Sequence, residues 1–340
     1  MDHFRVATRT YLDKLINKRL HETKLGEQVK TVSTEHWEEE LKNSTAKYVL
    51  LGIPEDIGVR ANYGLGGTHT LWEPALKAIL NIQNTSILDG ENILVLGAFD
   101  LSGLMQQSEN KDVLELRELV AQIDDMVSPV IAKIVEAGKL PIVIGGGHNN
   151  AYPIIQGTSS VSNIQINCIN LDAHSDYHIM EGRHSGNPFS YAKRKGYMDK
   201  YAVIGLHENY NSQIAIDELK EDHDIFFSFY EDVFIFGNDT YEHALNDAMQ
   251  HVKGKLTGVE LDLDCIANTL SSAGTPCGIS PRVARQYLAR CADSVNVAYV
   301  HIAEGATQLR SGQKDPSTAK LVAYLVTDFI KANQKYHSHE

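Results

Sequence analysis

Residues 163–176 read NIQINCINLDAHSD, an apolar run that passes directly into two acids and a histidine. A short apolar run of this kind is typical of a strand buried on both faces of a parallel sheet. Charged side chains are rarely buried without partners, so Asp172, His174 and Asp176 at the end of the run need an explanation. The segment therefore predicts a buried parallel sheet and a polar site at one edge of it.

Segments of the same kind lie before and after this one. Short apolar runs bounded by glycine, proline or acids occur at residues 47–58, 93–100, 140–148, 200–209, 257–264 and 295–305. Helical spacing of apolar residues occurs at 114–138, where Pro129 is expected to interrupt the helix, and at 281–293 and 316–334. Strands that alternate with helices predict an α/β fold with a mostly parallel sheet covered on both faces. We expect residues 1–45 to form an N-terminal helical extension and residues 46–340 to form a single domain.

The composition narrows the class of protein and of partner. The chain has 340 residues and a formal net charge of −13, from 31 basic and 44 acidic side chains. An acidic chain is poorly suited to polyphosphate backbones and anionic membrane surfaces, so we expect neither nucleic acid nor a membrane as a partner. No apolar run reaches the roughly 18–20 residues that a membrane span needs. None of the four cysteines forms a CxxC pair, which favours a reduced, cytoplasmic protein.

Three of the predicted strands end in side chains that can bind metals. They are His148 after IVIGGG, then Asp172, His174 and Asp176 after INCINL, and Asp262 and Asp264 in VELDLD. The carboxyl ends of parallel strands meet at one edge of a sheet, where ligands gather. If the segments stay extended, side chains two residues apart point the same way, so each strand aims its ligands at a common point.

A cation is the simplest partner for these six side chains. A single DxD is common in surface loops, but several carboxylates buried together are costly unless a cation compensates them. Four carboxylates and two imidazoles without a thiolate favour a hard cation, and six ligands exceed the needs of one tetrahedral zinc. We therefore expect two divalent cations about 3.5–4 Å apart. Mn²⁺ is the first choice, and Zn²⁺, Ni²⁺, Co²⁺ and Fe²⁺ stay open.

The ordered motifs GGGH, LDAHSD and ELDLD resemble those of the ureohydrolases, the family of arginase, agmatinase and formimidoylglutamase. GIPEDIGVRANYGLGG (52–67) resembles the early glycine-rich segment of this family, and the resemblance spans residues 47–330. It implies a three-layer α/β/α arginase-like fold, a trimeric or hexameric homo-oligomer, and metal binding by His148, Asp172, His174, Asp176, Asp262 and Asp264. It also implies that Glu304, in VHIAEG, holds the guanidinium or amidinium of a small-molecule substrate, although a glutamate there could be an ordinary exposed residue.

Three departures from the arginase pattern indicate which branch of the family the chain resembles most. Gly147 stands where arginases and agmatinases have aspartate, Ala267-Asn268 replaces their Asp-Pro, and Phe189 replaces the proton-shuttle histidine of arginases. Formimidoylglutamases resemble the chain at each point, which favours hydrolysis of N-formimino-L-glutamate to L-glutamate and formamide. An arginase, an agmatinase or another guanidino-compound hydrolase stays open, as do a one-zinc deacetylase-like enzyme and a catalytically inactive relative.

The expected reaction assigns roles to further residues. Two divalent cations lower the pKa of a bridging water, so that hydroxide attacks the planar formimino or guanidino carbon near neutral pH. Glu304 orients that carbon, and Asp176 is a candidate to relay the proton to the leaving nitrogen. The amino-acid end of the substrate needs cationic or N–H donors. Candidates, each of which could equally be an ordinary loop residue, are Arg60, Arg183, His184, Ser185, Gly186 and Asn187.

Overall fold

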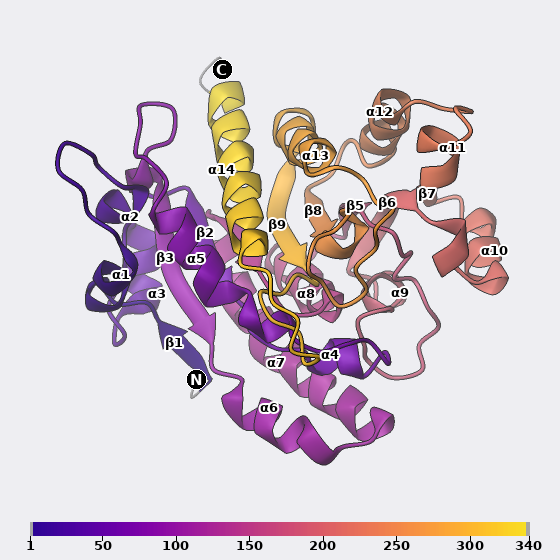
Figure 1. Ribbon diagram of the computed structural model, residues 1–340, viewed down its shortest axis with the longest axis horizontal. Coiled ribbons are helices and arrows are strands. Elements are labelled where there is room, and N and C mark those ends of the chain that lie inside the picture. Colours follow the sequence, from indigo (N-terminus) through magenta and orange to yellow (C-terminus); the bar gives the residue numbers. More distant parts are fainter. Residues whose placement is uncertain (1–2, 338–340) are drawn as a thin grey trace.

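A nine-stranded sheet forms the centre of the computed structural model, which describes residues 3–337. The strands follow the order β1-β3-β2-β4-β9-β8-β5-β6-β7, and every neighbouring pair is parallel except β1 and β3. Their bounds are β1 (Phe4–Val6), β2 (Tyr48–Gly52), β3 (Ile93–Phe99), β4 (Leu140–Ile144), β5 (Ile166–Leu171), β6 (Met198–Leu206), β7 (Ile225–Phe229), β8 (Thr257–Asp262) and β9 (Val297–Ala303). The sheet extends across the molecule, from β1 at one edge to β7 at the other (Figure 1).

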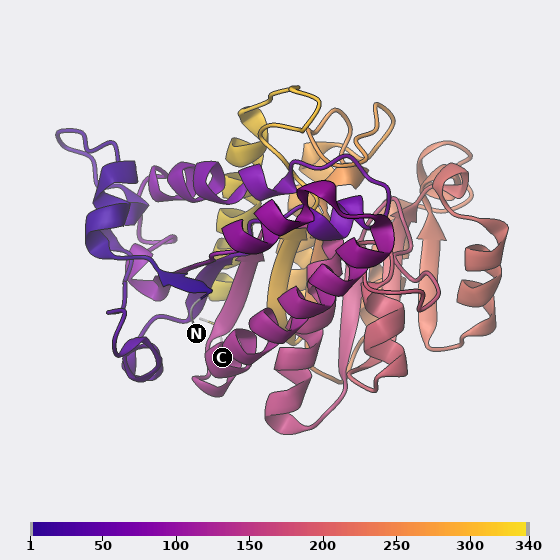
Figure 2. The ribbon, with the colours of Figure 1, turned by 90° about the horizontal axis from the view of Figure 1, so that it is seen from below.

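Helices cover both faces of the sheet (Figure 2). One layer contains α1 (Arg9–Leu15), α2 (Leu25–Gln28), α5 (Trp72–Leu80), α11 (Tyr230–Phe234), α12 (Tyr241–His251), α13 (Pro281–Ser294) and α14 (Ser317–His337). The other contains α3 (Trp37–Asn43), α4 (Ile57–Arg60), α6 (Ser102–Gln107), α7 (Val113–Glu136), α8 (Ala151–Ser162), α9 (Pro188–Arg194) and α10 (Gln213–Glu221). Each helical layer encloses a hydrophobic core against its face of the sheet, and side chains along each strand point alternately into one core and the other. In β5, Ile169 and Leu171 lie in the core under the first layer, and Ile166 and Cys168 lie in the core under the second. The predicted three-layer α/β/α fold with a mostly parallel sheet is confirmed.

Residues 1–45 contain more than the helices expected of them. Besides α1, α2 and α3, the described part of this segment contributes β1, which pairs antiparallel with β3. Leu12 and Leu25 are fully buried in the first core, and Leu41 is buried in the second. The segment therefore packs into both layers. A three-residue strand carries too little periodicity to be recognised in the sequence. The five-residue strand β7, at the opposite edge, was also missed.

Helix α7 passes through Pro129 without a break, although the sequence analysis expected an interruption there. An interior proline costs about 3 kcal/mol, because it removes one helical hydrogen bond and crowds the preceding turn. Packing outweighs this cost here: Val127 and Ile131, on either side of the proline, are fully buried in the hydrophobic core of the second layer.

No helix within residues 3–337 combines the length and hydrophobicity required to cross a bilayer.

The strand order brings the candidate site residues together. Strands β4, β9, β8 and β5 are consecutive neighbours at the centre of the sheet and run in the same direction. Their carboxyl ends lead to His148, Glu304, Asp262 and Asp172, respectively. Segments separated by more than 150 residues in the sequence, such as those of His148 and Glu304, therefore meet at one edge of the sheet.

Candidate active site

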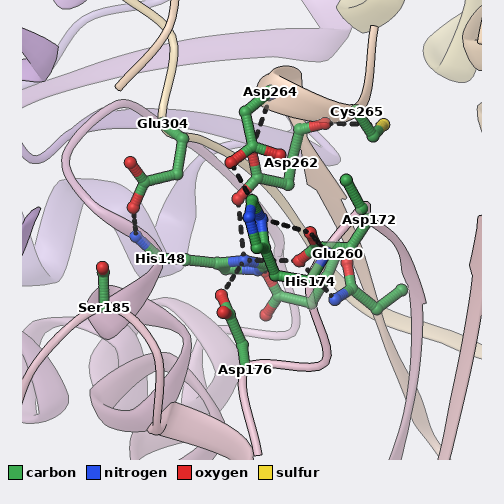
Figure 3. A network of polar contacts seen from close by, with 12 residues as sticks. His148, Asp172, His174, Asp176, Ser185, Glu260, Asp262, Asp264, Cys265 and Glu304 are labelled. Carbon is green, nitrogen blue, oxygen red and sulfur yellow. Dashed lines mark hydrogen bonds and ion pairs between the residues drawn. The ribbon is translucent and has the colours of Figure 1, made fainter. Parts of the chain in front are cut away.

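Three carboxylates surround one nitrogen of His148 (Figure 3). The Nδ1 atom lies 2.8 Å from Asp176 Oδ2 and 3.1 Å from both Asp172 Oδ2 and Asp262 Oδ2. His148 and Asp172 are fully buried, and the other two carboxylates are nearly so. One imidazole nitrogen cannot satisfy three carboxylates, so the group forms a pocket of negative charge suited to a cation.

A second group lies beside the first and shares one residue with it. His174 Nδ1 is 3.2 Å from Asp264 Oδ2 and 3.8 Å from Asp172 Oδ1. Asp172 therefore turns one carboxylate oxygen toward each histidine. Two adjoining groups that share a carboxylate match the arrangement in which a pair of cations is bridged.

Tight turns, rather than extended strands, make these side chains converge. Strand β5 ends at Leu171, before Asp172, and Asp264 lies in a 3-10 turn, η6 (Leu263–Cys265). In each motif the first aspartate accepts a hydrogen bond from the N–H two residues later: Asp172 from His174, and Asp262 from Asp264, both at 2.7 Å. This is the turn that aspartate favours. The expectation that strand alternation aligns the ligands was wrong, although the side chains do meet.

Two of the site carboxylates have a backbone conformation that is uncommon for residues other than glycine. The φ angle is 46° at Asp176 and 64° at Glu304. Such conformations cost about 1–3 kcal/mol each and persist where the surrounding structure enforces them. At Glu304 the turn is held by its N–H, which donates to the carbonyl of Gly146 at 3.0 Å. Backbone strain at Asp176 and Glu304 thus accompanies the orientation of both carboxylates in the site.

The donor set fits hard divalent cations. Asp264 Oδ1 is buried and has no hydrogen-bond partner among the described residues. An unpartnered buried polar atom is costly unless another species satisfies it. The atoms around both groups are carboxylate oxygens and imidazole nitrogens, the ligands expected for ions such as Mn²⁺. The two groups could therefore hold two such ions.

The carboxylates shift the protonation of both histidines. Burial acts to lower the pKa of His148, but hydrogen bonds with Asp172, Asp176 and Asp262 raise it well above its ordinary value. Burial likewise opposes the effect of Asp264 on His174, whose pKa is also raised well above its ordinary value. Without a cation, each imidazole thus carries a second proton in addition to its ordinary N–H, and a metal that binds has to displace one of the two.

Metal-free protein is expected to lose stability as the pH rises from about 7 to about 8.5. The native state keeps protons on His148, His174 and Glu304 that the unfolded chain has released, because the folded pKa of each is raised. Stability that depends on those protons disappears as the pH passes the folded pKa values. His184, whose pKa is lowered to about 3, is neutral in both states above pH 7 and does not oppose the trend. Thermal unfolding in EDTA measures the effect.

Mn²⁺-loaded protein provides the control for this titration. Its melting temperature should change less over the same range, because the bound cation has already displaced the protons from the histidines. A melting temperature of the metal-free protein that rises between pH 7 and pH 8.5 would contradict the assignment of these protons.

Glu304 lies at the rim of the two groups (Figure 3). Its Oε1 accepts a hydrogen bond from the backbone N–H of His148 at 2.6 Å, and its Oε2 accepts one from the hydroxyl of Ser272. Burial raises the pKa of this carboxyl to about 8, and the nearby Asp264 and Asp176 add to the rise. Glu304 is 3% exposed, so the alternative of an ordinary exposed glutamate does not hold. A cationic ligand beside it would favour its ionised form.

The two arginines considered for substrate binding make other contacts. Arg60 binds Asp56 and donates to the carbonyl and hydroxyl of Ser108. Arg183 is buried between the rings of Tyr152 and Tyr191, and its guanidinium donates to Asp124, Asn187 and the carbonyl of Asn149. Both guanidinium groups are therefore engaged inside the protein, and their binding to a substrate carboxylate stays a prediction.

The loop from His184 to Asn187 shapes the wall of the site rather than offering free charges. Asn187 is buried, and its carbonyl oxygen accepts hydrogen bonds from Arg183 and from the N–H of His184. His184 is fully buried, and its Nδ1 accepts from the N–H of Gly186. Ser185 donates its backbone N–H to the carbonyl of Gly58 at 3.1 Å. Ser185 is 8% exposed, whereas His184 and Asn187 have no exposed surface.

Phe189 is part of the core under the site. Its ring is fully buried, stacks on Tyr201 at 4.4 Å and meets the ring of His148 edge-on at 5.3 Å. The position at which the resemblance places a shuttle histidine in arginases therefore carries an apolar ring that supports His148. Proton transfer at this position is absent from the chain, since phenylalanine has no titratable group.

Glu55 is a structural residue of the site that the sequence analysis missed. Its Oε1 accepts from the N–H of Gly147 at 2.9 Å and the side-chain amide of Asn150 at 2.7 Å, and its Oε2 accepts from the N–H of Ile57 at 2.6 Å. A Cβ atom at Gly147 would lie 2.4 Å from Asn149 Oδ1, so asparagine fills the room that an aspartate would take. The buried carboxylate thus fastens the GGGH turn to the early glycine-rich segment.

Tyr210 covers the outer side of His174, a contact that the sequence did not predict. The two rings stack at 5.4 Å, and the tyrosine hydroxyl donates to Thr275 Oγ1 at 3.3 Å. Tyr210 is 45% exposed, so part of this residue meets solvent beside His174. LHENYN carries no periodic signal, and the contact depends on where the turn after β6 lies.

Comparison with known proteins identifies the family to which this site belongs. Residues 46–331 match the model of the arginase family. The chain belongs to the arginase family. Because the matched region includes all six candidate ligands and Glu304, the arginase-family resemblance seen in the motifs is confirmed.

Several relatives of this arginase-family chain are formimidoylglutamases. The protein from Hahella chejuensis is 29% identical over 186 residues, which cover 52% of this chain and 52% of that protein. The protein from Legionella pneumophila is 26% identical over 316 residues, which cover 86% of this chain and 88% of that protein. The match to the first relative thus spans about half of its length.

Solved structures share the arginase-family fold at low sequence identity. The formimidoylglutamase of Bacillus subtilis superimposes with a TM-score of 0.74 at 16% identity and covers 94% of each chain. The Mn²⁺-containing formiminoglutamase of Trypanosoma cruzi superimposes with a TM-score of 0.69 at 18% identity, covering 92% of this chain and 98% of that one. At these identities the likeness supports the fold and not the substrate.

Proposed function

We propose that this protein is a hydrolase of C–N bonds in linear amidines that converts N-formimino-L-glutamate and water to L-glutamate and formamide. The observation that carries the proposal is the meeting of two His–carboxylate groups with Glu304 at one edge of the sheet. Relatives named formimidoylglutamase that align over more than four fifths of the chain support the choice of reaction.

Six side chains are proposed to hold a pair of divalent cations, with Mn²⁺ as the first choice. His148, Asp176 and Asp262 would serve one ion, His174 and Asp264 the other, and Asp172 both. When bound, such a pair lowers the pKa of water so that hydroxide is available near neutral pH. The Mn²⁺ in the Trypanosoma cruzi structure supports this choice of metal.

The remaining chemistry is assigned to the chain's own carboxylates. Glu304 would bind the cationic N–H groups of the amidine and hold its planar carbon over the two groups, because a buried carboxylate forms strong charge-assisted hydrogen bonds. Asp176, which faces His148 at 2.8 Å, would carry a proton to the leaving nitrogen. Tyr210 and Ser185 would line the entrance. We further propose a cytoplasmic homo-oligomer, a trimer or hexamer, on the basis of the family resemblance.

A guanidino compound is the second candidate substrate, and one observation favours it. A cavity of about 470 Å³ adjoins Ser272, the residue that binds Glu304. Hydroxyl and amide side chains such as Thr269, Ser271 and Asn268 line it, together with Asp315, and its described lining includes no lysine or arginine. A substrate with two carboxylates would have to bind there through neutral donors, whereas an amine-bearing tail could pair with Asp315.

Turnover by Mn²⁺-loaded protein tests the proposal. We expect formamide and glutamate from N-formimino-L-glutamate, and no urea from arginine or agmatine. The EDTA-treated protein is the control and should be inactive until Mn²⁺ is restored. Urea as the product would reassign the substrate to the guanidino class. Two bound Mn²⁺ without turnover of any of these substrates would favour a catalytically inactive relative.

A further inference from the structure

A third polar group lies behind His148, on the side of its ring opposite the three carboxylates. His148 Nε2 is 3.4 Å from Oε2 of Glu260, which is also 2.7 Å from Nδ1 of His301. The other oxygen of Glu260 accepts a hydrogen bond from the hydroxyl of Tyr299 at 2.7 Å. All four residues are fully buried, so solvent does not share in this network. The burial of these polar side chains in the core therefore needs an explanation.

The sheet register builds this network from two neighbouring strands. Glu260 lies in β8 two residues before Asp262, so both side chains leave the same face of the strand. His301 is the direct partner of Glu260 in β9, and Tyr299 lies two residues before it on the same face. Tyr299 can reach across because its partner in β8 is Gly258, where a Cβ would lie 2.3 Å from the phenol ring. The glycine thus makes room for the tyrosine that restrains Glu260.

The position of Glu260 bears on which nitrogen of His148 is free. A neutral imidazole has one N–H and one lone pair, and a metal ligand must present the lone pair to the metal. Glu260 Oε2, 3.4 Å from Nε2, favours the N–H on that nitrogen and leaves the lone pair on Nδ1, the atom that faces Asp172, Asp176 and Asp262. A glutamate is unusual in the middle of a strand that is fully buried.

We propose that Glu260, held in place by Tyr299 and His301, is a positioning residue that fixes the ring and tautomer of His148 for metal binding. This inference rests on the proposed metal site. The competing account is a buried ion pair between Glu260 and His301 that serves stability alone. A second competing account is a further cation held by His148, Glu260 and His301, whose ligand atoms lie within 4.8 Å of one another.

Metal affinity separates positioning from a purely structural role. Metal-free wild-type protein and Glu260→Gln are titrated with Mn²⁺, with thermal unfolding recorded alongside. Glutamine keeps the size of the side chain, but its amide can donate to Nε2 and favour the wrong tautomer of His148. We expect the dissociation constant for Mn²⁺ to rise by about 10–100-fold, the usual effect of losing a partner of a metal-binding histidine. Turnover at saturating Mn²⁺ should then be partly restored.

Cys168→Ala is the matched control for damage to the core. Cys168 is fully buried in the same region, and its sulfur lies 3.6 Å from the Tyr299 hydroxyl. Among the described residues, its sulfur forms no hydrogen bond with Glu260 or His148. This variant should lose some thermal stability and bind Mn²⁺ as the wild type does. Should Glu260→Gln fail to fold, Tyr299→Phe decides: it removes one restraint on Glu260 and should weaken Mn²⁺ binding in the same direction, but less.

Each result has a defined meaning. Wild-type affinity in a folded Glu260→Gln, or in Tyr299→Phe where that variant decides, overturns the inference while leaving the metal site intact. An equal loss of affinity in Cys168→Ala also overturns it, since packing alone would then explain the effect. A third Mn²⁺ per wild-type chain that Glu260→Gln removes would favour the further cation site instead. Wild-type protein that binds no Mn²⁺ would refute the proposed metal site and this inference together.

Discussion

Replacing Asp172 by asparagine is expected to lower kcat/KM by at least about 10³-fold. The loss of cation assistance raises the activation free energy by several kcal/mol, and about 1.36 kcal/mol corresponds to a factor of ten in rate. Asp172 faces both histidines, with Oδ2 at 3.1 Å from His148 and Oδ1 at 3.8 Å from His174. An amide has no charge and only one acceptor oxygen, so both candidate ion sites are weakened together. Metal content after dialysis should fall from two Mn²⁺ per chain, and steady-state turnover measures the rest.

Asp199→Asn is the matched control for this variant. Asp199 lies in β6, and its carboxylate forms a partly exposed ion pair with Lys255 at 2.6 Å. Such pairs contribute about 0–1 kcal/mol, so activity and metal content should both stay at the wild-type level. Asp172→Asn that keeps two Mn²⁺ and full turnover would show that the two groups around the histidines are not the reaction centre.

The sequence was informative wherever a side chain follows a buried strand. His148, Asp172 and Asp262 could be grouped in advance because parallel strands bring their carboxyl ends to one edge, whatever the loops do. The reason given for the alignment within each motif was nevertheless wrong. Whether a chain stays extended or turns after the last strand residue depends on local hydrogen bonds, such as that from His174 to Asp172, which the spacing alone does not reveal.

Partners from distant segments could not be predicted. Arg183 looked like a free cation in a loop, but its partner Asp124 lies 59 residues earlier, in a helix whose position no local pattern specifies. Glu260 is different, because a signal was present: a glutamate inside an apolar strand, two residues before a metal-binding aspartate, shares a face with it. A histidine within the mostly apolar run VAYVHIA is a comparable signal, and it would have drawn attention to His301.

The second large effect is expected from Glu304→Gln, which should lower kcat/KM by about 10²–10³-fold, or about 3–4 kcal/mol, by removing a buried charge that pairs with the cationic substrate. Glutamine can still accept the hydrogen bond from the N–H of His148, so the turn should persist. Because Glu304 lies outside both metal-binding groups, two Mn²⁺ per chain should remain bound. Steady-state kinetics together with metal analysis measure both expectations.

Two further variants separate charge from position at this residue. Glu304→Asp keeps the charge but withdraws it by one methylene, and a displacement of about 1 Å can itself cost about 10²-fold. Ser272→Ala leaves Glu304 unchanged and removes only the hydroxyl that donates to Oε2, so a smaller loss is expected. If Glu304→Gln lost its Mn²⁺ along with its activity, the carboxylate would act on the metal site rather than on the amidine. Equal kcat/KM for the wild type and Glu304→Gln would leave the substrate cation without its proposed partner.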